Sequence, residues 1–261
     1  MKKTEINIDY NAYPESMHEI IKNAKVYDSS SSPEARVIFI DKGDGYFLKT
    51  AEKGSLGREA EMTAYFGKLC LSANVLEYLS EDKDYLLTNR IKGEDCTYFE
   101  YLENPKRLCD MIAEKLFDLH HISYIGCPVL NRTAEYLKCA EHNYLKGVFD
   151  PTFVCDRLKL FKKEDLWNFV KENKNVLKSD TLIHGDYCLP NILFDKWSFS
   201  GFIDVGNGGV ADKHIDLFWG AWTLGFNLKT DRFRDRFFDA YGRNNFDVEI
   251  IDLISAIEAF G

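Results

Sequence analysis

No stretch of this 261-residue sequence approaches the length of an apolar membrane span. The N-terminal residues Met1–Glu5 also lack the hydrophobic core of a secretion signal. The seven cysteines are dispersed, without a C-x-x-C pair and without the spacing of a metal site. Together these absences predict a cytoplasmic protein with reduced thiols and no membrane partner.

The sequence also lacks an excess of positive charge. Its formal net charge is −9, which argues against a nucleic-acid partner, because phosphate backbones require basic surfaces. A moderately acidic surface suits a cationic substrate, although the same charge also simply keeps a protein soluble. With 45% hydrophobic residues, the chain has the composition of an ordinary globular protein of one large domain or two lobes.

Internal repeats and low-complexity tracts are absent, so the organisation must be inferred from local patterns. The first ninety residues are rich in β-branched and aromatic runs separated by turn residues. Four strands are expected there, at 36–40, 46–50, 75–79 and 85–88. Apolar residues recur at helical spacing from 55 to 69, and Ser55 is expected to cap this helix.

After Arg90–Gly93 the pattern becomes helical. Asn104 and Pro105 suit the start of a helix that extends to about residue 120. Further helices are expected at 131–146, 163–173, 213–226, 231–241 and 247–260. These patterns predict an α+β fold with a strand-rich lobe at 1–90 and a mainly helical lobe at 91–261, and the cleft between two lobes is a natural ligand site.

The most informative segment is Leu182–Asn191, which is followed closely by Ser200–Asp204. It contains Asp186, an Asn five residues later at 191, and Asp204 thirteen residues beyond that. Transfer of a phosphoryl group needs an acceptor hydroxyl held in line and metal ions that neutralise phosphate charge. One carboxylate can accept the hydroxyl proton, while an amide oxygen and a second carboxylate suit Mg²⁺.

The same three residues could instead be unrelated turn residues, because Asp and Asn are common in turns. Their surroundings favour the functional interpretation. Runs 191–194 and 199–205 both have the composition of short strands, and 195–198 has that of the turn between them. A polar loop that leads into a hairpin ending near an Asp is typical of a kinase-like phosphotransferase.

A nucleotide-binding first lobe would need a Lys on a strand and an acidic partner on the following helix. Lys49 lies in an apolar strand pattern, and Glu59 lies in the next helical pattern. A Lys so placed can bridge two phosphates, and the Glu can keep it oriented. The alternative is an ordinary exposed pair, which the downstream Asp/Asn/Asp pattern makes the weaker interpretation.

At this point the sequence closely resembles the aminoglycoside O-phosphotransferases, in particular those that phosphorylate kanamycin and neomycin at the 3′-hydroxyl. The resemblance spans almost the whole chain. It rests on these segments: Ser32–Pro33, Phe47–Lys49, Arg58–Glu59, Leu86–Thr88, Cys127–Pro128, His184–Asp186, Asn191–Ile192, Phe202–Gly206, Ala211–Lys213, Asp216, Arg236–Phe238 and Ala240–Gly242. The HGD-to-N and IDxG motifs are shared with choline and homoserine kinases, whereas the Ala-Asp-Lys segment and the tail are more specific.

The resemblance implies a protein-kinase-like fold of two lobes, the first binding nucleotide and the second carrying the catalytic loop and the acceptor site. It implies that Asp186 is the catalytic base. By the same resemblance, Asn191 and Asp204 are the Mg²⁺ ligands, and Lys49 with Glu59 binds the phosphates. The implied nucleotide is ATP, with GTP as the alternative.

Four further positions are implied to bind the nucleotide. Phe47 matches an aromatic residue that stacks on adenine, and Asn89 and Ile91 match connector positions whose backbone groups bind the base. Ser32 falls in the loop over the phosphates. That loop has no glycine, so backbone amides and serine hydroxyls would replace the bare backbone of a protein-kinase loop.

Two polar residues near the catalytic loop are interpreted as structural. His184 could act as an acid–base group, but in this family the matching His packs and orients the loop. Asp216 resembles the aspartate that braces the same loop.

On the acceptor side, the family uses acidic residues to hold the ammonium groups of its substrates. Asp156 matches one acid of the helical insertion, but its neighbours are not acidic. Glu258 matches one of two acids near the end of the chain, whereas Ile257 stands where the other would be. Asp156 and Glu258 are therefore the predicted acceptor ligands, with a narrower substrate range than the best-matched relatives.

We therefore expect a cytoplasmic, ATP- and Mg²⁺-dependent aminoglycoside phosphotransferase, a monomer or weak dimer. The first alternative is a kinase of the same fold for a metabolite alcohol such as choline, homoserine or a methylthio-sugar. A second is a catalytically silent nucleotide-binding scaffold. The presence of all five predicted polar site residues argues against it, namely Lys49, Glu59, Asp186, Asn191 and Asp204. A metal hydrolase is the least supported, because His184 and Asp186 are too sparse a ligand set.

Overall fold

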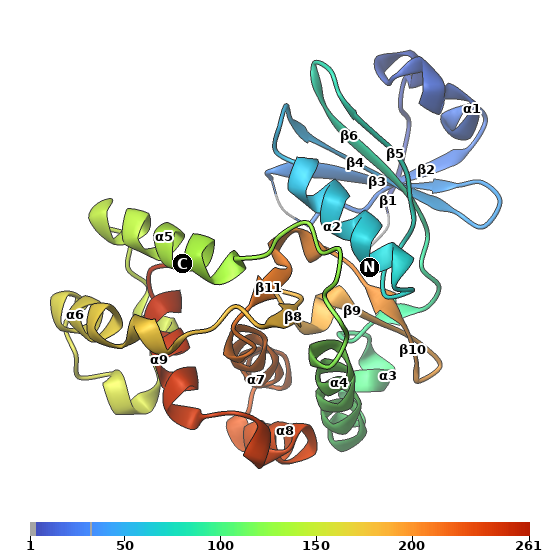
Figure 1. Ribbon diagram of the computed structural model, residues 1–261. Helices are drawn as coiled ribbons and strands as arrows, with labels where there is room; N and C mark the ends of the chain where they lie inside the picture. Colours follow the sequence, from blue (N-terminus) through green and yellow to red (C-terminus); the bar gives the residue numbers. More distant parts are fainter. Residues whose placement is uncertain (1–3, 32) are drawn as a thin grey trace. The chain divides into compact units, whose positions relative to one another are not determined.

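The computed structural model describes residues 4–31 and 33–261 (Figure 1). Two compact units can be distinguished, each with its own packing. Unit 1 consists of the chain up to Asp95 together with Ile192–Gly206, and unit 2 consists of Cys96–Asn191 and Asn207–Gly261. The segment between Ile192 and Gly206 therefore returns to the unit formed by the start of the chain.

Unit 1 contains a six-stranded antiparallel sheet in the order β1-β2-β3-β4-β6-β5. Its strands are β1 (Thr4–Ile6), β2 (Lys25–Asp28), β3 (Ala35–Asp41), β4 (Tyr46–Glu52), β5 (Val75–Ser80) and β6 (Lys83–Asn89). The four strands expected from the sequence are confirmed within two residues at each end. The sequence pattern did not reveal β1 and β2.

Each face of this sheet is covered by helical residues. On one face, Ile38 and Leu48 pack with Met17 and Ile21, which lie in or beside α1 (His18–Ile21). On the other face, Leu86 packs with Ala60 of α2 (Gly57–Lys68). Since side chains of a strand alternate between faces, the direction of every residue of β4 follows from Leu48.

The start of α2 differs from the sequence prediction. Ser55 does not cap the helix, because its hydroxyl donates to the Glu52 carbonyl at 2.6 Å and the N-cap residue is Leu56. Asp84 of β6 replaces it, accepting the Leu56 backbone N–H at 2.8 Å and that of Gly54 at 2.9 Å. Burial raises the pKa of Asp84, but its hydrogen-bond donors outweigh that effect and lower it to about 2.

A second sheet in unit 1 has the order β10-β9-β7, formed by β7 (Glu94–Asp95), β9 (Ile192–Asp195) and β10 (Ser198–Phe202). The predicted hairpin is confirmed by the pairing of β9 with β10. Its second strand ends at Phe202, earlier than expected. Gly93 is required before β7, because a Cβ there would lie 2.1 Å from the Phe194 carbonyl oxygen.

Unit 2 is mainly helical. Its α-helices are α3 (Phe99–Leu102), α4 (Pro105–His120), α5 (Arg132–Leu145), α6 (Lys163–Asn173), α7 (His214–Leu228), α8 (Arg234–Tyr241) and α9 (Val248–Glu258). The helix α7 packs against α4, α8 and α9. The expected helices are confirmed, and with the sheets of unit 1 they confirm the α+β fold.

A short two-stranded sheet accompanies these helices. It consists of β8 (Thr181–Ile183) and β11 (Gly209–Ala211), which pair antiparallel. The sequence did not predict either strand, because three residues are too few to show a period. The segment His184–Asp186 begins immediately after β8, so this strand fixes its position in unit 2.

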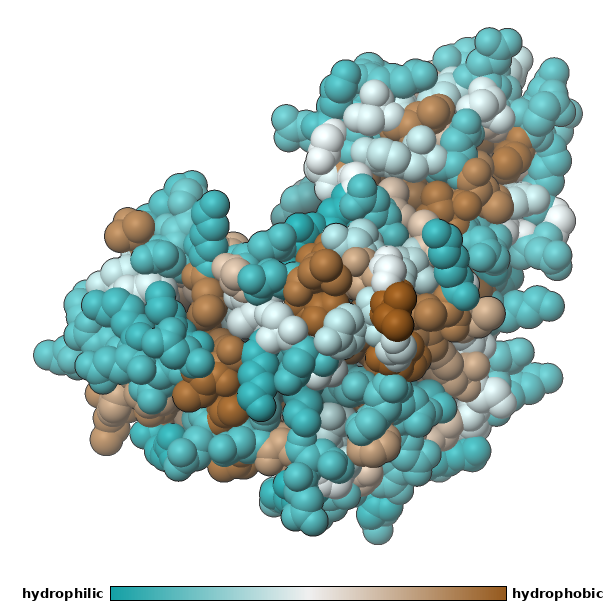
Figure 2. All heavy atoms as spheres, viewed as in Figure 1, coloured by the Kyte–Doolittle hydropathy of each residue, from teal (hydrophilic) through white to brown (hydrophobic). Residues whose placement is uncertain are grey.

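Hydrophilic side chains cover most of the face drawn in Figure 2, with hydrophobic patches between them. Within residues 4–31 and 33–261, no helix combines the length and the apolar composition that crossing a membrane would require.

Candidate active site

Lys49 is directed by the alternation of β4. Its neighbour Leu48 is fully buried in the core on one face of the sheet. Lys49 therefore points to the opposite face, where its pairing partner Leu86 packs under α2. Glu59 lies in the first turn of that helix, so the strand and the helix bring the two side chains together.

The Lys49 ammonium group has two carboxylate partners, both within unit 1. Its Nζ lies 2.8 and 2.7 Å from the two carboxylate oxygens of Glu59 and 3.0 Å from Oδ1 of Asp204. Burial lowers the pKa of Lys49, but the negative charges of Asp204 and Glu59 outweigh burial and raise it above its ordinary value. Lys49 is thus held as a fixed cation.

Asp204 follows β10 in an unusual backbone conformation. Its φ is +54°, in the left-handed region that non-glycine residues rarely occupy and that Asp tolerates better than most. Its side chain is 46% exposed, so the carboxylate can also reach a ligand. Strained conformations of this kind cluster at functional sites. Gly206 permits close packing here, because a Cβ on it would lie only 3.2 Å from the Glu59 Cβ.

In unit 2, Asp186 and Asn191 form a second polar pair. The Asn191 side-chain amide donates to Oδ2 of Asp186 at 2.9 Å and to its backbone carbonyl at 3.0 Å. Asn191 is buried at the end of a 3₁₀ turn, Leu189–Asn191, whereas Asp186 is half-buried. The amide therefore fixes the orientation of the Asp186 carboxylate while part of that residue faces solvent.

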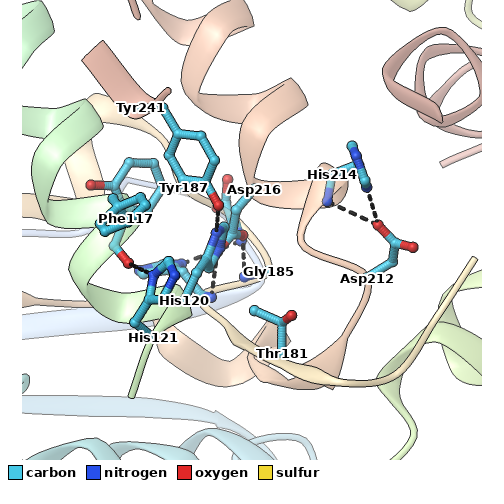
Figure 3. Close-up of polar contacts among 12 residues, drawn as sticks. Phe117, His120, His121, Thr181, Gly185, Tyr187, Asp212, His214, Asp216 and Tyr241 are labelled. Carbon is cyan, nitrogen blue, oxygen red and sulfur yellow. Dashed lines mark hydrogen bonds and ion pairs between the residues drawn. The ribbon is translucent and has the colours of Figure 1, made fainter. Parts of the chain in front are cut away.

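The backbone around Asp186 is fixed by Asp216, the fully buried carboxylate in the first turn of α7 (Figure 3). It accepts the backbone N–H groups of His184 and Gly185, both at 2.7 Å. Gly185 has φ +82°, and a Cβ there would lie 2.0 Å from the Asn207 carbonyl oxygen. The bracing contact expected of Asp216 is thus present, and only glycine fits position 185.

Two buried histidines belong to the same support. The His184 ring packs edge-on to Tyr187, and its Nδ1 accepts the Asp186 backbone N–H at 3.3 Å. His120 lies between the Tyr241 hydroxyl at 2.8 Å and Asp216 at 3.4 Å (Figure 3). Burial lowers the pKa of His120, so it stays neutral at physiological pH. These geometries fit a structural role.

The predicted base-binding residues lie on unit 1. Phe47 of β4 is half-buried against Phe39, with ring centroids 5.1 Å apart. The Asn89 amide is engaged locally, accepting the Asn74 N–H at 2.6 Å. Ile91 packs over Gly201, where a Cβ would lie 2.9 Å from the Ile91 Cδ1. Ser32, the fourth position, lies outside the described residues.

The two predicted acceptor ligands have opposite environments in unit 2. Asp156 has a side chain that is 91% exposed and forms an ion pair with Lys159, three residues later. That ion pair lowers the pKa of Asp156. Glu258 is only 6% exposed at the end of α9. The structure does not bring these two side chains into contact.

Two donors that the sequence did not reveal hold Glu258. The Tyr136 hydroxyl donates to its Oε1 at 2.9 Å, and the Trp219 indole N–H donates to the same atom at 3.0 Å. Tyr136 lies 122 positions away and Trp219 lies 39 positions away, so no local pattern could link them to Glu258. Burial raises the pKa of Glu258 to about 7 despite these two donors.

This pKa shift predicts a pH-dependent effect of Glu258→Gln on stability. Between pH 4.5, the ordinary pKa, and about 7, the folded state retains a proton that the unfolded state releases. The Glu258 contribution to stability is therefore complete below pH 4.5 and is lost as the pH rises through about 7. The Gln side chain keeps an oxygen acceptor but cannot ionise. The free energy of unfolding of the variant, relative to that of the unsubstituted protein, should therefore rise by roughly 2–3 kcal/mol from pH 4.5 to 8.

Urea unfolding of both proteins at the two pH values measures this difference. Asp156→Asn provides the control, because the exposed Asp156 should give a much smaller change over the same range. An equal change in both variants would show that Glu258 is not a buried carboxyl group with a raised pKa.

Comparison with known proteins gives consistent matches. The family model described as "Phosphotransferase enzyme family" matches residues 30–252. A probable aminoglycoside 3′-phosphotransferase of Lactococcus lactis subsp. lactis (strain IL1403) is 50% identical over 262 residues, covering 100% of this chain and 99% of that protein.

Solved structures show a similar fold. A crystal structure of an aminoglycoside-3′-phosphotransferase of type VIII has a TM-score of 0.75 and 21% identity, covering 96% of each chain. The aminoglycoside phosphotransferase APH(3″)-Id from Streptomyces rimosus, in complex with ADP and streptomycin, has a TM-score of 0.70 and 19% identity. That match covers 86% of this chain and 90% of the other. These solved phosphotransferases thus share the fold of this chain, for which the sequence predicted two lobes.

Proposed function

Because the chain belongs to the phosphotransferase enzyme family, we propose that it transfers the γ-phosphate of ATP to a hydroxyl group of an aminoglycoside, at the 3′ position, and thereby confers resistance. The observation that carries this proposal is the 50% identity to a probable aminoglycoside 3′-phosphotransferase across the whole of both chains. Five polar residues support it, namely Lys49, Glu59, Asp186, Asn191 and Asp204.

Asp186 is the proposed catalytic base. Its carboxylate is half-buried, oriented by Asn191, and set in a backbone segment anchored by the buried Asp216. A carboxylate so positioned accepts the proton of the acceptor hydroxyl as that oxygen attacks the γ-phosphorus. The O–P bond to the sugar forms as the bond to the β-phosphate oxygen breaks, without a phosphorylated enzyme. Asp186 then carries the proton, which it releases to water.

Lys49 is the proposed phosphate ligand, oriented by Glu59. Two short contacts hold its ammonium group on Glu59, and the partly exposed Asp204 carboxylate lies 3.0 Å from the same group. A fixed cation is suited to two adjacent phosphate groups, because it needs no reorganisation when charge develops there. The complex of a similarly folded phosphotransferase with ADP supports nucleotide binding at this fold.

Asn191 and Asp204 are the proposed Mg²⁺ ligands. Both offer hard oxygen donors, and Mg²⁺ is ordinarily held by one or two carboxylates together with substrate phosphates. The described part of the chain contains no group of three or more His, Cys, Asp and Glu side chains that could hold a metal. When bound, the ion neutralises charge on the transferred phosphoryl group.

The remaining nucleotide contacts are proposed at Phe47, Asn89, Ile91 and Ser32, with ATP preferred and GTP as the alternative. In this proposal, residues 1–90 form the nucleotide-binding lobe and 91–261 the lobe with the catalytic loop and acceptor site. None of the seven cysteines forms a disulfide, and a cytoplasmic location is part of this proposal. A monomer or weak dimer, without nucleic-acid or membrane partners, stays a prediction.

Asp156 and Glu258 are the proposed ligands of the cationic acceptor. The buried Glu258 is the stronger candidate, because the attraction between a carboxylate and an ammonium group is stronger where water is excluded. An exposed ion pair such as Asp156 would make contributes only roughly 0.2–1 kcal/mol. A metabolite-alcohol kinase of the same fold is the second candidate. It is favoured by the nonacidic surroundings of Asp156, including the half-buried Phe153 and the buried Val154.

Steady-state kinetics with kanamycin, neomycin and the 3′-deoxy compound tobramycin test this function. We expect the two substrates with a free 3′-hydroxyl to be phosphorylated and tobramycin to be essentially inert, because it lacks the accepting oxygen. Equal turnover of tobramycin would refute the 3′ assignment. Turnover of choline or homoserine, but of no aminoglycoside, would establish the metabolite kinase instead.

A further inference from the structure

Three helices of unit 2 converge on the carboxyl group of Glu258. Tyr136 comes from α5, Trp219 from α7 and Glu258 from α9. Both donors bind one oxygen, Oε1, at 2.9 and 3.0 Å. Two hydrogen bonds to a single oxygen restrict rotation of the carboxyl group, so its second oxygen, Oε2, has a defined direction.

The donors to Glu258 are neutral. Among residues 4–31 and 33–261, no Lys, Arg or His side chain forms an ion pair with it. Two charged groups act on it electrostatically: Asp186 raises its pKa and Arg132 lowers it. Arg132 is itself bound to Glu135 at 3.3 Å and to the Asn207 carbonyl oxygen at 3.0 Å. Because no internal cation forms an ion pair with Glu258, the charge of its ionised form remains available to a cation from outside.

We propose that Tyr136 and Trp219 are positioning residues that hold the Glu258 carboxyl group for an ammonium group of the substrate. This inference rests on the proposed function and identifies how the acceptor site recognises an amino sugar. Oε2 is the oxygen presented to the ammonium group. Gly261 contributes to the room around it, because a Cβ at this position would lie 2.8 Å from Oε2.

A linkage between pH and acceptor binding follows from this arrangement. Burial raises the pKa of Glu258 to about 7, so the ionised form that attracts an ammonium group increases as the pH rises through neutrality. KM for the aminoglycoside should therefore fall as the pH rises toward 8. Hydrogen bonds to a carboxylate favour its charged form. Removing either donor should raise the pKa of Glu258 and move this pH dependence upward.

Four variants test the positioning role. Tyr136→Phe and Trp219→Phe each remove one donor and retain an aromatic ring. Tyr144→Phe on α5 and Trp222→Phe on α7 are matched controls, because their rings stack on Trp167 and Phe226 and neither binds Glu258. The measurements are kcat and KM for kanamycin and KM for ATP from pH 5.5 to 8.5, with thermal unfolding to verify each fold.

Loss of a hydrogen bond to a charged group should raise KM for kanamycin about tenfold in Tyr136→Phe and in Trp219→Phe. Their KM for ATP should stay within about twofold, and their pH dependence should shift upward by about one pH unit. The controls should match the unsubstituted protein in all three respects. Identical KM values and pH profiles in Tyr136→Phe and Tyr144→Phe would overturn the inference, and Tyr136→Phe alone decides it if Trp219→Phe fails to fold.

The unsubstituted protein separates this inference from the proposed function. If the unsubstituted protein phosphorylates no aminoglycoside, the proposed function and the assignment of Glu258 as a ligand of an ammonium group are both overturned. An NMR titration of ¹³C-labelled Glu258 without substrate tests the positioning by itself. A higher pKa in Tyr136→Phe than in Tyr144→Phe supports it, and equal pKa values refute it.

Discussion

Replacing Asp186 with Ala is expected to reduce kcat for aminoglycoside phosphorylation by about 10²–10⁴, the usual contribution of a positioned general base. Binding of the nucleotide should be nearly unchanged, because Asp186 is proposed to act only on the acceptor hydroxyl. The fold should also persist, since the buried Asp216 anchors the backbone of this loop without using the Asp186 side chain.

Kinetics at saturating nucleotide, combined with calorimetric titration of ADP, measure both effects. Asp195→Ala is a suitable control, because Asp195 is an exposed carboxylate at the end of β9. Turnover in Asp186→Ala equal to that in the control would remove Asp186 from the mechanism. Loss of ADP binding together with loss of turnover would instead indicate a disrupted loop.

Replacing Asp204 with Asn is expected to lower kcat by roughly 10²-fold and to raise the Mg²⁺ concentration needed for half-maximal turnover. The substitution removes the negative charge and leaves the backbone unchanged, because Asn tolerates the left-handed conformation that Asp204 adopts at φ +54°. The Lys49 ammonium group would keep its two contacts with Glu59 and lose only the ion pair at 3.0 Å with Asp204.

Turnover as a function of Mg²⁺ concentration distinguishes the metal role from a purely structural one. A structural defect would lower kcat at every Mg²⁺ concentration by the same factor. KM for the aminoglycoside should change little, because Asp204 is not proposed to bind the acceptor. An unchanged Mg²⁺ dependence would place the metal on other residues.

Local patterns predict most of the secondary structure and several site residues. The periods of β4 and α2 are visible in the sequence, and together with the downstream Asp/Asn/Asp pattern they suffice to nominate Lys49 and Glu59 as a pair. Their bonds of 2.7–2.8 Å confirm that contact, although their roles toward a nucleotide stay proposals. Asp186 and Asn191 are five residues apart, so one tight turn brings them together, and the motif therefore predicts their proximity.

Features that depend on distant segments were not predicted. Ser55 has the composition of a helix cap, but its hydroxyl binds Glu52, and the buried Asp84 from β6 satisfies the start of α2. The hairpin of β9 and β10 was predicted as a local unit, yet nothing in its sequence shows that it packs with the first ninety-five residues. Propensity describes what a segment favours by itself, whereas the partner of a buried polar group depends on tertiary packing.

Glu258 shows this division most clearly. The sequence by itself nominated it as an acid for a cationic substrate, together with Asp156, and treated the two alike. Only the tertiary structure distinguishes them, with Asp156 exposed beside Lys159 and Glu258 buried between Tyr136 and Trp219. Residue type determines that a side chain can carry charge. Desolvation and hydrogen-bond donors from other helices set the pKa of the carboxyl group and the direction in which its oxygens point.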